Sequence, residues 1–406
     1  MKWTNKGHEL DDISSFLINK KHCYLWGAGT YGRHLLAYIE KLRAYIEFDI
    51  TLLDKNADIQ RQGLNGLPVY SPDLLNNSDT ESSFVIIGTS SITNPCAVDT
   101  IKESAQKAGY VLNKNLFDYE YFLYTCISVY FLYKYNKVYF SSLSVLPSTI
   151  CNLNCKACLN FNPYIKKHTT YTLEEMKNGI NLLFSKVDLI GRFQITGGEP
   201  LLYKDIENLV EYIGSNFRKQ IVFFEIVTNG TVVPSDKLCE LLRRYDICVH
   251  LDDYRMSVEK AKKIFDVIKN KLVTNGISVE HRFANNEKWI SLVQDSVCKE
   301  TLDTKVLEKK FFSCECPWTT LAGNAISSCN YSLYAYKAGI IDYCSEDYLD
   351  LSTINENNKA ELVEFRCRFN ERGYVELCKK CNGFYKINPN SIPAAEQVER
   401  AKRGVL

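Results

Sequence analysis

The segment from Cys151 to Cys158 constrains this chain more than any other. Its three cysteines, Cys151, Cys155 and Cys158, lie within eight residues of a polar loop of Asn and Lys. Three thiolates this close can bind a four-iron cluster and leave one iron without a protein ligand, because such a cube normally takes four. An open coordination position is typical of catalytic metal sites. The alternatives are a zinc knuckle and three buried thiols, which the polar loop and the lack of a following Cys/His pair disfavour.

A second motif, Gly197-Gly198-Glu199-Pro200, follows the expected strand 193–196. Glycines at a strand end allow another backbone or a ligand to approach closely. Together with the three cysteines, this motif resembles the radical S-adenosylmethionine (radical SAM) superfamily. The resemblance implies that the cysteines hold a [4Fe–4S] cluster whose open iron chelates SAM, and that residues 197–200 hold the methionine amino group.

In that family, electron transfer from the cluster splits SAM into methionine and a 5′-deoxyadenosyl radical. Members usually carry an aromatic residue just before the third cysteine, near the adenine, whereas this chain has Ala157 there. The resemblance also implies that Thr228 and Asn229 contact the SAM ribose. The alternative for these two residues is a plain turn, because Asn-Gly alone marks one.

The chain has 406 residues and a formal net charge of +1. This length predicts two or three domains, and the balanced charge gives no reason to expect binding to nucleic acid or to an anionic membrane. The N-terminus lacks the apolar core of a signal peptide. Sixteen cysteines in a chain that we expect to be cytoplasmic indicate metal ligands rather than disulfides.

A first domain is predicted for residues 1–115. An apolar stretch precedes the loop that contains Gly27, Gly29 and Gly32, a helical pattern follows it, and the next expected strand ends at Asp54. This order is typical of a doubly wound, Rossmann-like sheet, in which the loop amides bind a phosphate and the acidic residue accepts from a ribose hydroxyl. The domain resembles Rossmann modules of sugar-modifying enzymes, which implies a nucleotide, a nucleotide-sugar or NAD(P) as ligand. The alternative is a module that binds nothing.

Residues 116–137 are predicted to connect the domains. Phe and Tyr fill eleven of the 24 positions from 117 to 140. The longest uncharged run has 13 residues, Tyr121 to Tyr133, and a membrane span needs about 20. We favour a buried segment over a dimer surface or a wall of the substrate site.

Residues 138–313 are predicted to form the catalytic domain. Strand and helix patterns alternate along them, which predicts an α/β fold with a parallel sheet. The resemblance implies a partial (βα)6 barrel with its chemistry at the carboxyl ends of the strands.

Several polar residues lie in or just after these expected strands. Asp252 and Asp253 could face SAM or substrate, or could form a solvated pair, and neither interpretation is preferred. His250 is expected to be packed or hydrogen-bonded rather than catalytic. Glu225 and Arg282 could point into the barrel, but a single sequence does not decide their face.

The C-terminal part, residues 314–406, contains seven cysteines. Their arrangement resembles the twitch domain, a shorter relative of the SPASM domain, which implies one auxiliary [4Fe–4S] cluster. A zinc site is the alternative. The proposed ligands are Cys316, Cys329, Cys378 and Cys381, with Cys314 as the rival to Cys316. Cys344 and Cys367 have no assigned role, and the other six cysteines are expected to be packing residues: Cys23, Cys96, Cys126, Cys239, Cys248 and Cys298.

These predictions describe a radical SAM enzyme with a Rossmann-like module and a twitch/SPASM-type domain. The stretch 158–164 resembles enzymes of carbohydrate and surface-polysaccharide pathways, which implies a sugar or nucleotide-sugar substrate and a dehydrogenation, epimerisation or deoxygenation. The alternative is a peptide-modifying maturase, although many of those begin with a winged-helix module. A non-catalytic iron–sulfur sensor is disfavoured by the intact SAM motifs. Such an enzyme needs a reducing partner such as flavodoxin or ferredoxin, and no catalytic residue is assigned.

Overall fold

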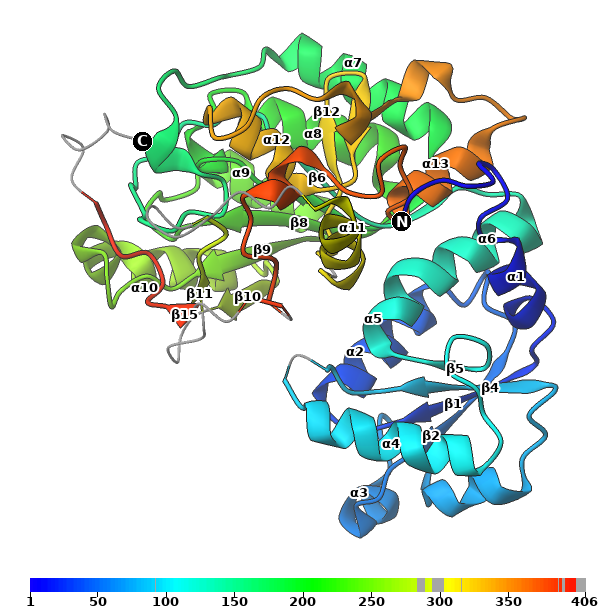
Figure 1. Cartoon of the computed structure of the whole chain (residues 1–406). Coiled ribbons are helices and arrows are strands. Elements are labelled where there is room, and N and C mark those ends of the chain that lie inside the picture. The colour runs from blue at the N-terminus through cyan, green and yellow to red at the C-terminus, as the bar shows by residue number, and fades with distance from the viewer. Residues whose placement is uncertain are drawn as a thin grey trace. The chain divides into compact units, whose positions relative to one another are not determined.

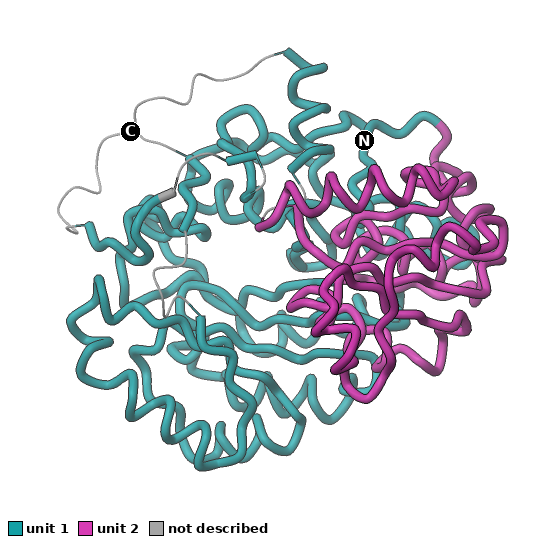
Figure 2. The backbone as a smooth tube through the Cα atoms, turned by 90° about the horizontal axis from the view of Figure 1, so that it is seen from below, with its two compact units in different colours: residues 1–4, 142–406 teal, residues 5–141 magenta. Residues whose placement is uncertain are grey.

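The computed structural model of this α/β protein describes residues 1–91, 93–282, 289–293, 303–314, 316–385, 387–388 and 391–398. The chain forms two compact units (Figure 2). Residues Asn5–Ser141, magenta and keyed as unit 2, are called the first unit here because they come first along the chain; Met1–Thr4 with Ser142–Leu406, teal and keyed as unit 1, are called the second unit. The division after Ser141 differs from the boundary predicted at residue 115. The structure also groups residues 138–313 and 314–406 almost entirely into one unit.

The first unit contains a five-stranded, parallel sheet with the order β3-β2-β1-β4-β5. This is the strand order of a doubly wound sheet. Its strands are β1 (His22–Trp26), β2 (Asp49–Leu53), β3 (Val69–Tyr70), β4 (Ser83–Ile87) and β5 (Leu116–Phe117). Its connecting helices are α1 (Asp11–Leu17), α2 (Thr30–Lys41), α3 (Ala57–Gln62) and α4 (Pro95–Lys107).

The aromatic segment belongs to this first unit, not to a separate connector. It forms the short helix α5 (Tyr119–Tyr121), a π-helical turn and helix α6 (Ile127–Tyr135). The segment is largely buried, as predicted, and its rings pack on the sheet: Phe122 stacks on Phe84 at 5.9 Å and Tyr130 meets Phe48 edge-on at 6.1 Å. Burial against this sheet therefore moves the domain boundary past residue 137.

The second unit is built on an eight-stranded sheet with the order β10-β9-β8-β7-β6-β12-β13-β14 (Figure 1). Strands β7 to β10 are parallel neighbours, β12 is parallel to β6, and β13 and β14 are antiparallel additions. The strands are β6 (Tyr139–Val145), β7 (Leu189–Ile195), β8 (Ile221–Thr228), β9 (Ile247–Asp252), β10 (Val279–Arg282), β12 (Thr320–Ala322), β13 (Ala325–Ser327) and β14 (Tyr348–Asp350).

The expected six-unit barrel is thus only partly matched in the described residues. Five strands, β6 to β10, follow one another across the sheet in chain order. The next strand of the sheet, β12, lies beside β6 and not beside β10, so it does not continue the series as a sixth unit. The C-terminal part shares this sheet instead of forming a sheet of its own. No helix among the described residues is long and apolar enough to cross a membrane.

Amphipathic helices follow the central strands, and α7 begins with the predicted capping box between Thr172 and Glu175. A small antiparallel pair, β11 (Trp289–Ile290) with β15 (Ser391–Ile392), connects two distant segments. The helices of this unit are α7 (Leu173–Lys186), α8 (Ile206–Phe217), α9 (Asp236–Arg244), α10 (Glu259–Thr274), α11 (Thr304–Ser313), α12 (Asn330–Lys337) and α13 (Lys359–Arg366).

Candidate functional site

The structure brings the three predicted cysteines and the glycine motif to one cavity of about 230 Å³ in the second unit. Cys151, Cys155 and Cys158 all line it. Burial raises the pKa of the Cys151 thiol to about 12, and burial raises the pKa of Cys155 and Cys158 as well. Such thiols hold their protons until a metal ion replaces them. Three thiols around a shared space fit a cuboidal cluster with one open iron.

Glycines 197 and 198 are required by close packing against the segment that leads into the cysteine loop. The amide of Gly198 donates to the Ser148 carbonyl at 2.9 Å, and the amide of Glu199 donates to the Ile150 carbonyl at 2.8 Å. A Cβ on Gly198 would lie 2.1 Å from the Ile150 oxygen. Gly197 has a φ of +150°, and a Cβ on it would lie 2.5 Å from the Ser148 oxygen. The motif therefore ties two loops together in addition to lining the cavity.

Glu199 lines the cavity with a buried carboxylate held by three donors. These are the Thr228 hydroxyl at 2.8 Å, the Asn229 amide at 2.8 Å and the Leu201 amide at 3.0 Å. Burial raises the pKa of Glu199 to about 7, although the three hydrogen bonds lower it. Thr228 directs its hydroxyl at Glu199, so its observed contact differs from the ribose contact predicted for it.

Asn229 lines the cavity, and its side-chain amide donates to Asn152 Oδ1 at 3.0 Å. This bond joins the end of β8 to the cysteine loop. Pro200, by contrast, is buried at the start of a short turn, Pro200–Leu202, and shapes the chain after Glu199. Among the residues predicted to bind the cofactor, Gly197, Gly198, Glu199 and Asn229 thus line the cavity, whereas Thr228 and Pro200 support them from outside it.

A charged cluster lines the same cavity at the ends of β9 and β10. Arg282 donates from Nε to Asp252 Oδ1 at 2.8 Å, and the Tyr254 hydroxyl donates to Asp252 Oδ2 at 2.9 Å. Burial raises the pKa of Asp252, and Arg282 lowers it. Asp253 points elsewhere and pairs with Arg255 at 2.7 Å. The structure therefore distinguishes the two aspartates, for which the sequence supported the same two interpretations: Asp252 lines the cavity and Asp253 does not.

Strands β7 and β8 also carry an ion pair between the half-buried Arg192 and the buried Glu225. Arg192 donates to both oxygens of Glu225, at 2.8 and 2.9 Å, and His250 Nε2 lies 3.4 Å from Glu225 Oε2. Burial raises the pKa of Glu225, but Arg192 and His250 outweigh it and hold the pKa at about 2. Burial lowers the pKa of His250, whereas Cys248 and Glu225 raise it to about 9. His250 is packed, as predicted.

Several aromatic and amide residues of the cavity were not predicted, among them Gln194, Trp318 and Trp289. Gln194 donates to Glu225 at 3.4 Å and lines the cavity floor. The Trp318 ring lines the cavity and lies 4.9 Å from the Arg192 guanidinium. Trp289 lines the cavity beside the cysteine loop and donates from its indole to the Ala157 carbonyl at 2.6 Å. In the sequence, only the small side chain of Ala157, where the resemblance leads one to expect an aromatic residue, indicated that a ring from elsewhere in the chain would lie beside the cysteine loop.

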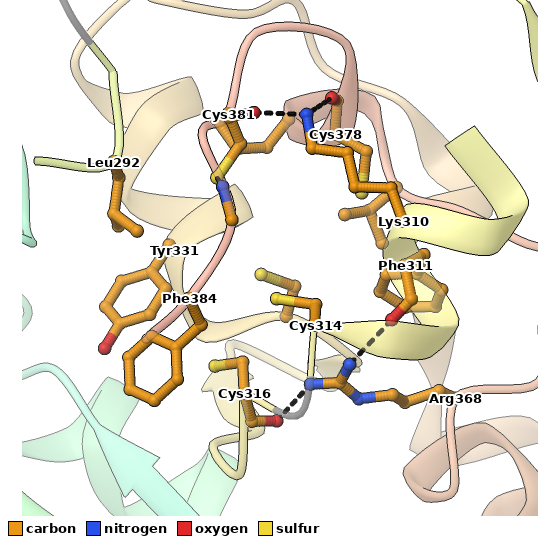
Figure 3. A pocket seen from close by; sticks show the side chains of 14 residues that line it. Leu292, Lys310, Phe311, Cys314, Cys316, Tyr331, Arg368, Cys378, Cys381 and Phe384 are labelled. Atoms are coloured by element: carbon orange, nitrogen blue, oxygen red, sulfur yellow. Dashed lines mark hydrogen bonds between the residues drawn. The ribbon is translucent and has the colours of Figure 1, made fainter. Parts of the chain in front are cut away.

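The cysteines of the C-terminal part surround a second cavity (Figure 3). Two cations border it: Lys310 donates to the carbonyls of Cys378 and Cys381, and Arg368 donates to those of Phe311 and Cys316. Five cysteines line this cavity, namely Cys314, Cys316, Cys329, Cys378 and Cys381. The four predicted ligands and the rival Cys314 are therefore all brought together. No group of three or more His, Cys, Asp or Glu among the described residues surrounds a single-metal position.

The two cavities share a wall. Tyr331 and Phe384 line both of them, and their rings stack at 5.9 Å with an interplanar angle of 27°. The auxiliary cysteines are therefore separated from the first cavity by aromatic side chains.

The remaining cysteines lie outside these two cavities. Cys23, Cys126 and Cys239 are buried, as expected of packing residues. Cys96 is exposed and Cys248 is half-buried, so the packing prediction is wrong for Cys96. Cys298 lies outside the described residues. Cys344 is half-buried and Cys367 is buried, and neither lines a described cavity.

The predicted glycine loop of the first unit borders a cavity of about 460 Å³. Gly27 and Gly29 line it, and a Cβ on Gly29 would meet no atom within 4 Å. Gly32 has a packing role, because its Cβ would lie 1.8 Å from the Gly27 oxygen. Asp54 also lines the cavity, but its carboxylate accepts from the amides of Ala28 and Asn56, each at 2.8 Å. Its observed role is to hold the loop.

Comparison with known proteins agrees with the geometry of the cysteine site. The family model described as Radical SAM superfamily matches residues 145–299. Residues 145–299 are therefore similar to the radical SAM superfamily, and the match supports an enzyme that uses SAM. No curated protein matches the chain.

Several solved structures resemble parts of the chain. Streptococcus suis SuiB bound to precursor peptide SuiA is 19% identical over 44% of this chain and 37% of its own, with a TM-score of 0.29. BtrN in complex with AdoMet and 2-DOIA is 16% identical over 60% and 92%, with a TM-score of 0.39. The protein anSMEcpe with AdoMet and the Cp18Cys peptide is 14% identical over 62% and 88%, with a TM-score of 0.37. This chain thus spans 37% of the length of SuiB.

Proposed function

We propose that this protein is a radical SAM enzyme that abstracts hydrogen from a sugar or nucleotide-sugar. The observation that carries the proposal is one cavity that combines the three cysteines, the Gly197–Glu199 motif and the Asp252–Arg282 pair. The cysteines supply the cluster ligands, and the charged side chains of the same cavity can bind a polar molecule. A substrate held there would lie next to SAM.

The chain's own residues position SAM. With a [4Fe–4S] cluster on Cys151, Cys155 and Cys158, reductive cleavage of SAM would supply a 5′-deoxyadenosyl radical. Glu199 is oriented by its three donors and can accept from the methionine ammonium group. The Trp289 ring lies against Ala157 and can pack on the adenine, in place of the aromatic residue that this position lacks.

The substrate end of the cavity suits a polyhydroxylated molecule. Gln194, Asp252 and Arg282 offer an amide, a carboxylate and a guanidinium in a partly dry space, which can bind neighbouring hydroxyls. Trp318 offers a ring that Arg192 supports from one side. A site built to hydrogen-bond hydroxyl groups strongly rejects molecules that lack them. Asp252 is also the nearest candidate for a base, because it reaches the cavity while Asp253 does not.

The second cavity is proposed to hold an auxiliary [4Fe–4S] cluster on Cys316, Cys329, Cys378 and Cys381. Cys314 lines the same cavity and remains the rival of Cys316. A cube with four thiolate ligands carries net negative charge, and the half-buried Arg368 beside Cys316 favours that charge. An electron leaving the substrate radical would have only the Tyr331–Phe384 wall to cross, which favours dehydrogenation among the three reaction types.

The first unit is proposed to bind a nucleotide, with the pyrophosphate against Gly27 and Gly29. The amides at the start of α2 have no side-chain cap, so they can donate to a phosphate. The ligand would be the nucleotide-sugar itself or a nucleotide such as NAD(P). Because Asp54 is occupied by its own loop, recognition of the ribose would fall to other residues of this cavity.

The central experiment measures SAM cleavage and hydrogen transfer. Anaerobically reconstituted, dithionite-reduced protein should convert SAM to 5′-deoxyadenosine, and Cys155→Ala should abolish this conversion. Nucleotide-sugars deuterated at every ring carbon should then transfer deuterium into 5′-deoxyadenosine. A physiological reductant such as flavodoxin or ferredoxin should replace dithionite.

The control is Cys344→Ala, which removes a cysteine away from both cavities and should retain full cleavage. Equal turnover by wild type and Cys155→Ala would refute the radical SAM assignment. Deuterium transfer only from peptides would keep that assignment and replace the sugar by a peptide. Bound clusters without any SAM cleavage would indicate a sensor.

Iron content separates the two clusters. Wild type should bind about eight irons, and the Cys151/Cys155/Cys158 triple alanine variant about four. Zinc in that variant, or no metal, would refute the auxiliary cluster without affecting the SAM site.

A further inference from the structure

A short C-terminal segment, residues 391–398, crosses the cysteine loop, and we name it the C-terminal strap. The amide of Lys156 donates to the Glu396 carbonyl at 2.7 Å, and the amide of Val398 donates to the Asn154 carbonyl at 2.9 Å. Ala395 is buried in the apolar cluster that includes Leu153. The strap is thus held by backbone bonds on both sides of Cys155 and by an apolar contact.

Within the strap, the side-chain amide of Gln397 faces the sulfur of Cys155. Its Nε2 lies 3.3 Å from Cys155 Sγ and 2.7 Å from the Ala395 carbonyl oxygen. Its Oε1 accepts from the backbone amide of Asn154 at 2.8 Å. Each polar atom of this side chain therefore has a defined partner.

These partners decide which way the amide points. The backbone amide of Asn154 can only donate, so the atom that faces it must be the oxygen of Gln397. The carbonyl of Ala395 can only accept, so the atom that faces it must be the nitrogen. The second N–H of the same nitrogen is then directed at Cys155. If the amide were flipped, its NH2 group would face the N–H of Asn154 and its oxygen would face the carbonyl oxygen of Ala395, and neither contact could be a hydrogen bond.

We propose that Gln397 is a positioning residue for the three-cysteine site and donates an N–H to the Cys155 thiolate when the cluster is bound. The inference rests on the proposed function, because it assumes a cluster on these cysteines. Hydrogen bonds to cluster sulfurs and partners of first ligands adjust the potential of a metal site. A donor stabilises the additional negative charge of the reduced cluster, so Gln397 raises the reduction potential and makes the cluster easier to reduce.

The decisive measurement is an EPR-monitored redox titration of the full chain with both clusters. Adding SAM perturbs only a cluster with an open iron, which identifies the signal of the three-cysteine site. Two substitutions remove the donor: Gln397→Leu, which is apolar, and Gln397→Glu, which keeps an oxygen for the Asn154 amide and places a carboxylate beside Cys155. The control is Val398→Ala, which alters the strap but keeps its backbone bonds.

The SAM-sensitive signal should titrate at a lower potential in Gln397→Leu and lower still in Gln397→Glu, with Val398→Ala unchanged and the auxiliary signal unmoved in all three. Wild-type potentials in both Gln397 variants would overturn the proposal. A shift in Gln397→Leu alone would also overturn it, because the effect would then come from anchoring Asn154. A wild-type protein without any SAM-sensitive signal would refute the proposed function itself, and the role of Gln397 with it.

Discussion

The backbone amide of Glu199 donates to the carbonyl oxygen of Ile150 at 2.8 Å, which holds Glu199 beside the residue that precedes Cys151, the first cysteine of the loop. The bond is possible because Gly198 has no Cβ to keep the two backbones apart. The backbone bond therefore holds Glu199 and the cysteine loop in a fixed arrangement relative to each other.

Replacing Gly198 by Ala should disrupt the three-cysteine site. Its Cβ would lie 2.1 Å from the Ile150 oxygen, so the segment before Cys151 must move. The variant should bind about four irons instead of about eight, since only the auxiliary site keeps its geometry. The control is Gly29→Ala, whose Cβ meets no atom within 4 Å and which should keep all its iron. A fully loaded Gly198→Ala protein would contradict this view of the motif.

SAM affinity should depend on the ionisation of Glu199. Burial raises the pKa of this carboxyl to about 7, and only the ionised form can pair with the ammonium group of SAM. The Kd should therefore rise about tenfold per unit as pH falls below 7. Anaerobic calorimetry between pH 5.5 and 7.5 measures this slope. Glu199→Gln should bind weakly at every pH. Asp252→Asn should move the slope to lower pH, because the charge of Asp252 raises the pKa of Glu199; a flat wild-type profile would count against the pairing.

Trp289 should contribute to SAM binding. Stacking of a base on an aromatic side chain is worth about 1–3 kcal/mol, so Trp289→Ala should weaken SAM binding by about tenfold or more. Trp289→Phe should recover part of the loss. The matched control is Trp318→Ala, at the substrate end of the same cavity, which should leave SAM affinity unchanged. If Trp318→Ala weakens SAM binding more than Trp289→Ala, the two rings have been assigned to the wrong ligands.

The Arg192–Glu225 pair should stabilise the second unit. Arg192→Met leaves a buried carboxylate without its bidentate partner, and the free energy of unfolding should fall by about 3 kcal/mol at pH 7. The pKa of Glu225 is held at about 2 in the folded state, below its ordinary value near 4.5. Its contribution is therefore present above about pH 4.5 and lost as pH falls towards 2. Urea unfolding at pH 7 and pH 3.5 tests both statements.

The exposed pair of Arg244 with Glu240 provides the control for that comparison. Arg244 also pairs with Glu211 on the surface, and such exposed pairs contribute little to stability because water screens them. Arg244→Met should therefore change stability little at either pH. An equal loss in both arginine variants would show that the buried pair adds nothing specific.

The first unit should lose its ligand, but not its fold, in Gly29→Val. The new side chain would enter the open cavity, where no atom lies within 4 Å of the Cβ. Titration of the full chain with UDP, UDP-glucose and NAD should give heat for wild type and none for the variant. Gly32→Ala is the structural comparison, because its Cβ would collide with the Gly27 carbonyl and should destabilise the loop. Absence of heat in wild type with all three compounds would refute nucleotide binding of these classes.

The parts of the site that depend on short-range sequence patterns could be predicted from the sequence. Cysteine spacing and the glycine motif predicted that two segments more than forty residues apart would meet, and they line one cavity. Short-range patterns also predicted strands β1, β2 and β7 to β9, because apolar runs between turn residues specify them locally. The C-terminal cysteines converge as predicted for the same reason.

The parts that failed depend on which surface a segment packs against. The aromatic residues from Phe117 to Tyr135 are apolar on every side, so their composition predicts burial but not the sheet that buries them. Asp252 and Asp253 differ by one position and therefore face opposite sides of a strand, which only the register decides. Trp289, Trp318 and Gln397 are far in sequence from the cysteine loop, and no local pattern connects them to it.

The C-terminal strap also has a consequence for synthesis of the protein. Gln397 contacts Cys155 across 242 positions of sequence, whereas most bonds around the glycine motif join segments about fifty residues apart. Contacts of such high sequence separation form late, and a growing chain folds from its N-terminal side first. The strap therefore reaches Cys155 only after some 240 further residues have been added. This interval gives the iron–sulfur assembly machinery access to the loop before the strap covers it.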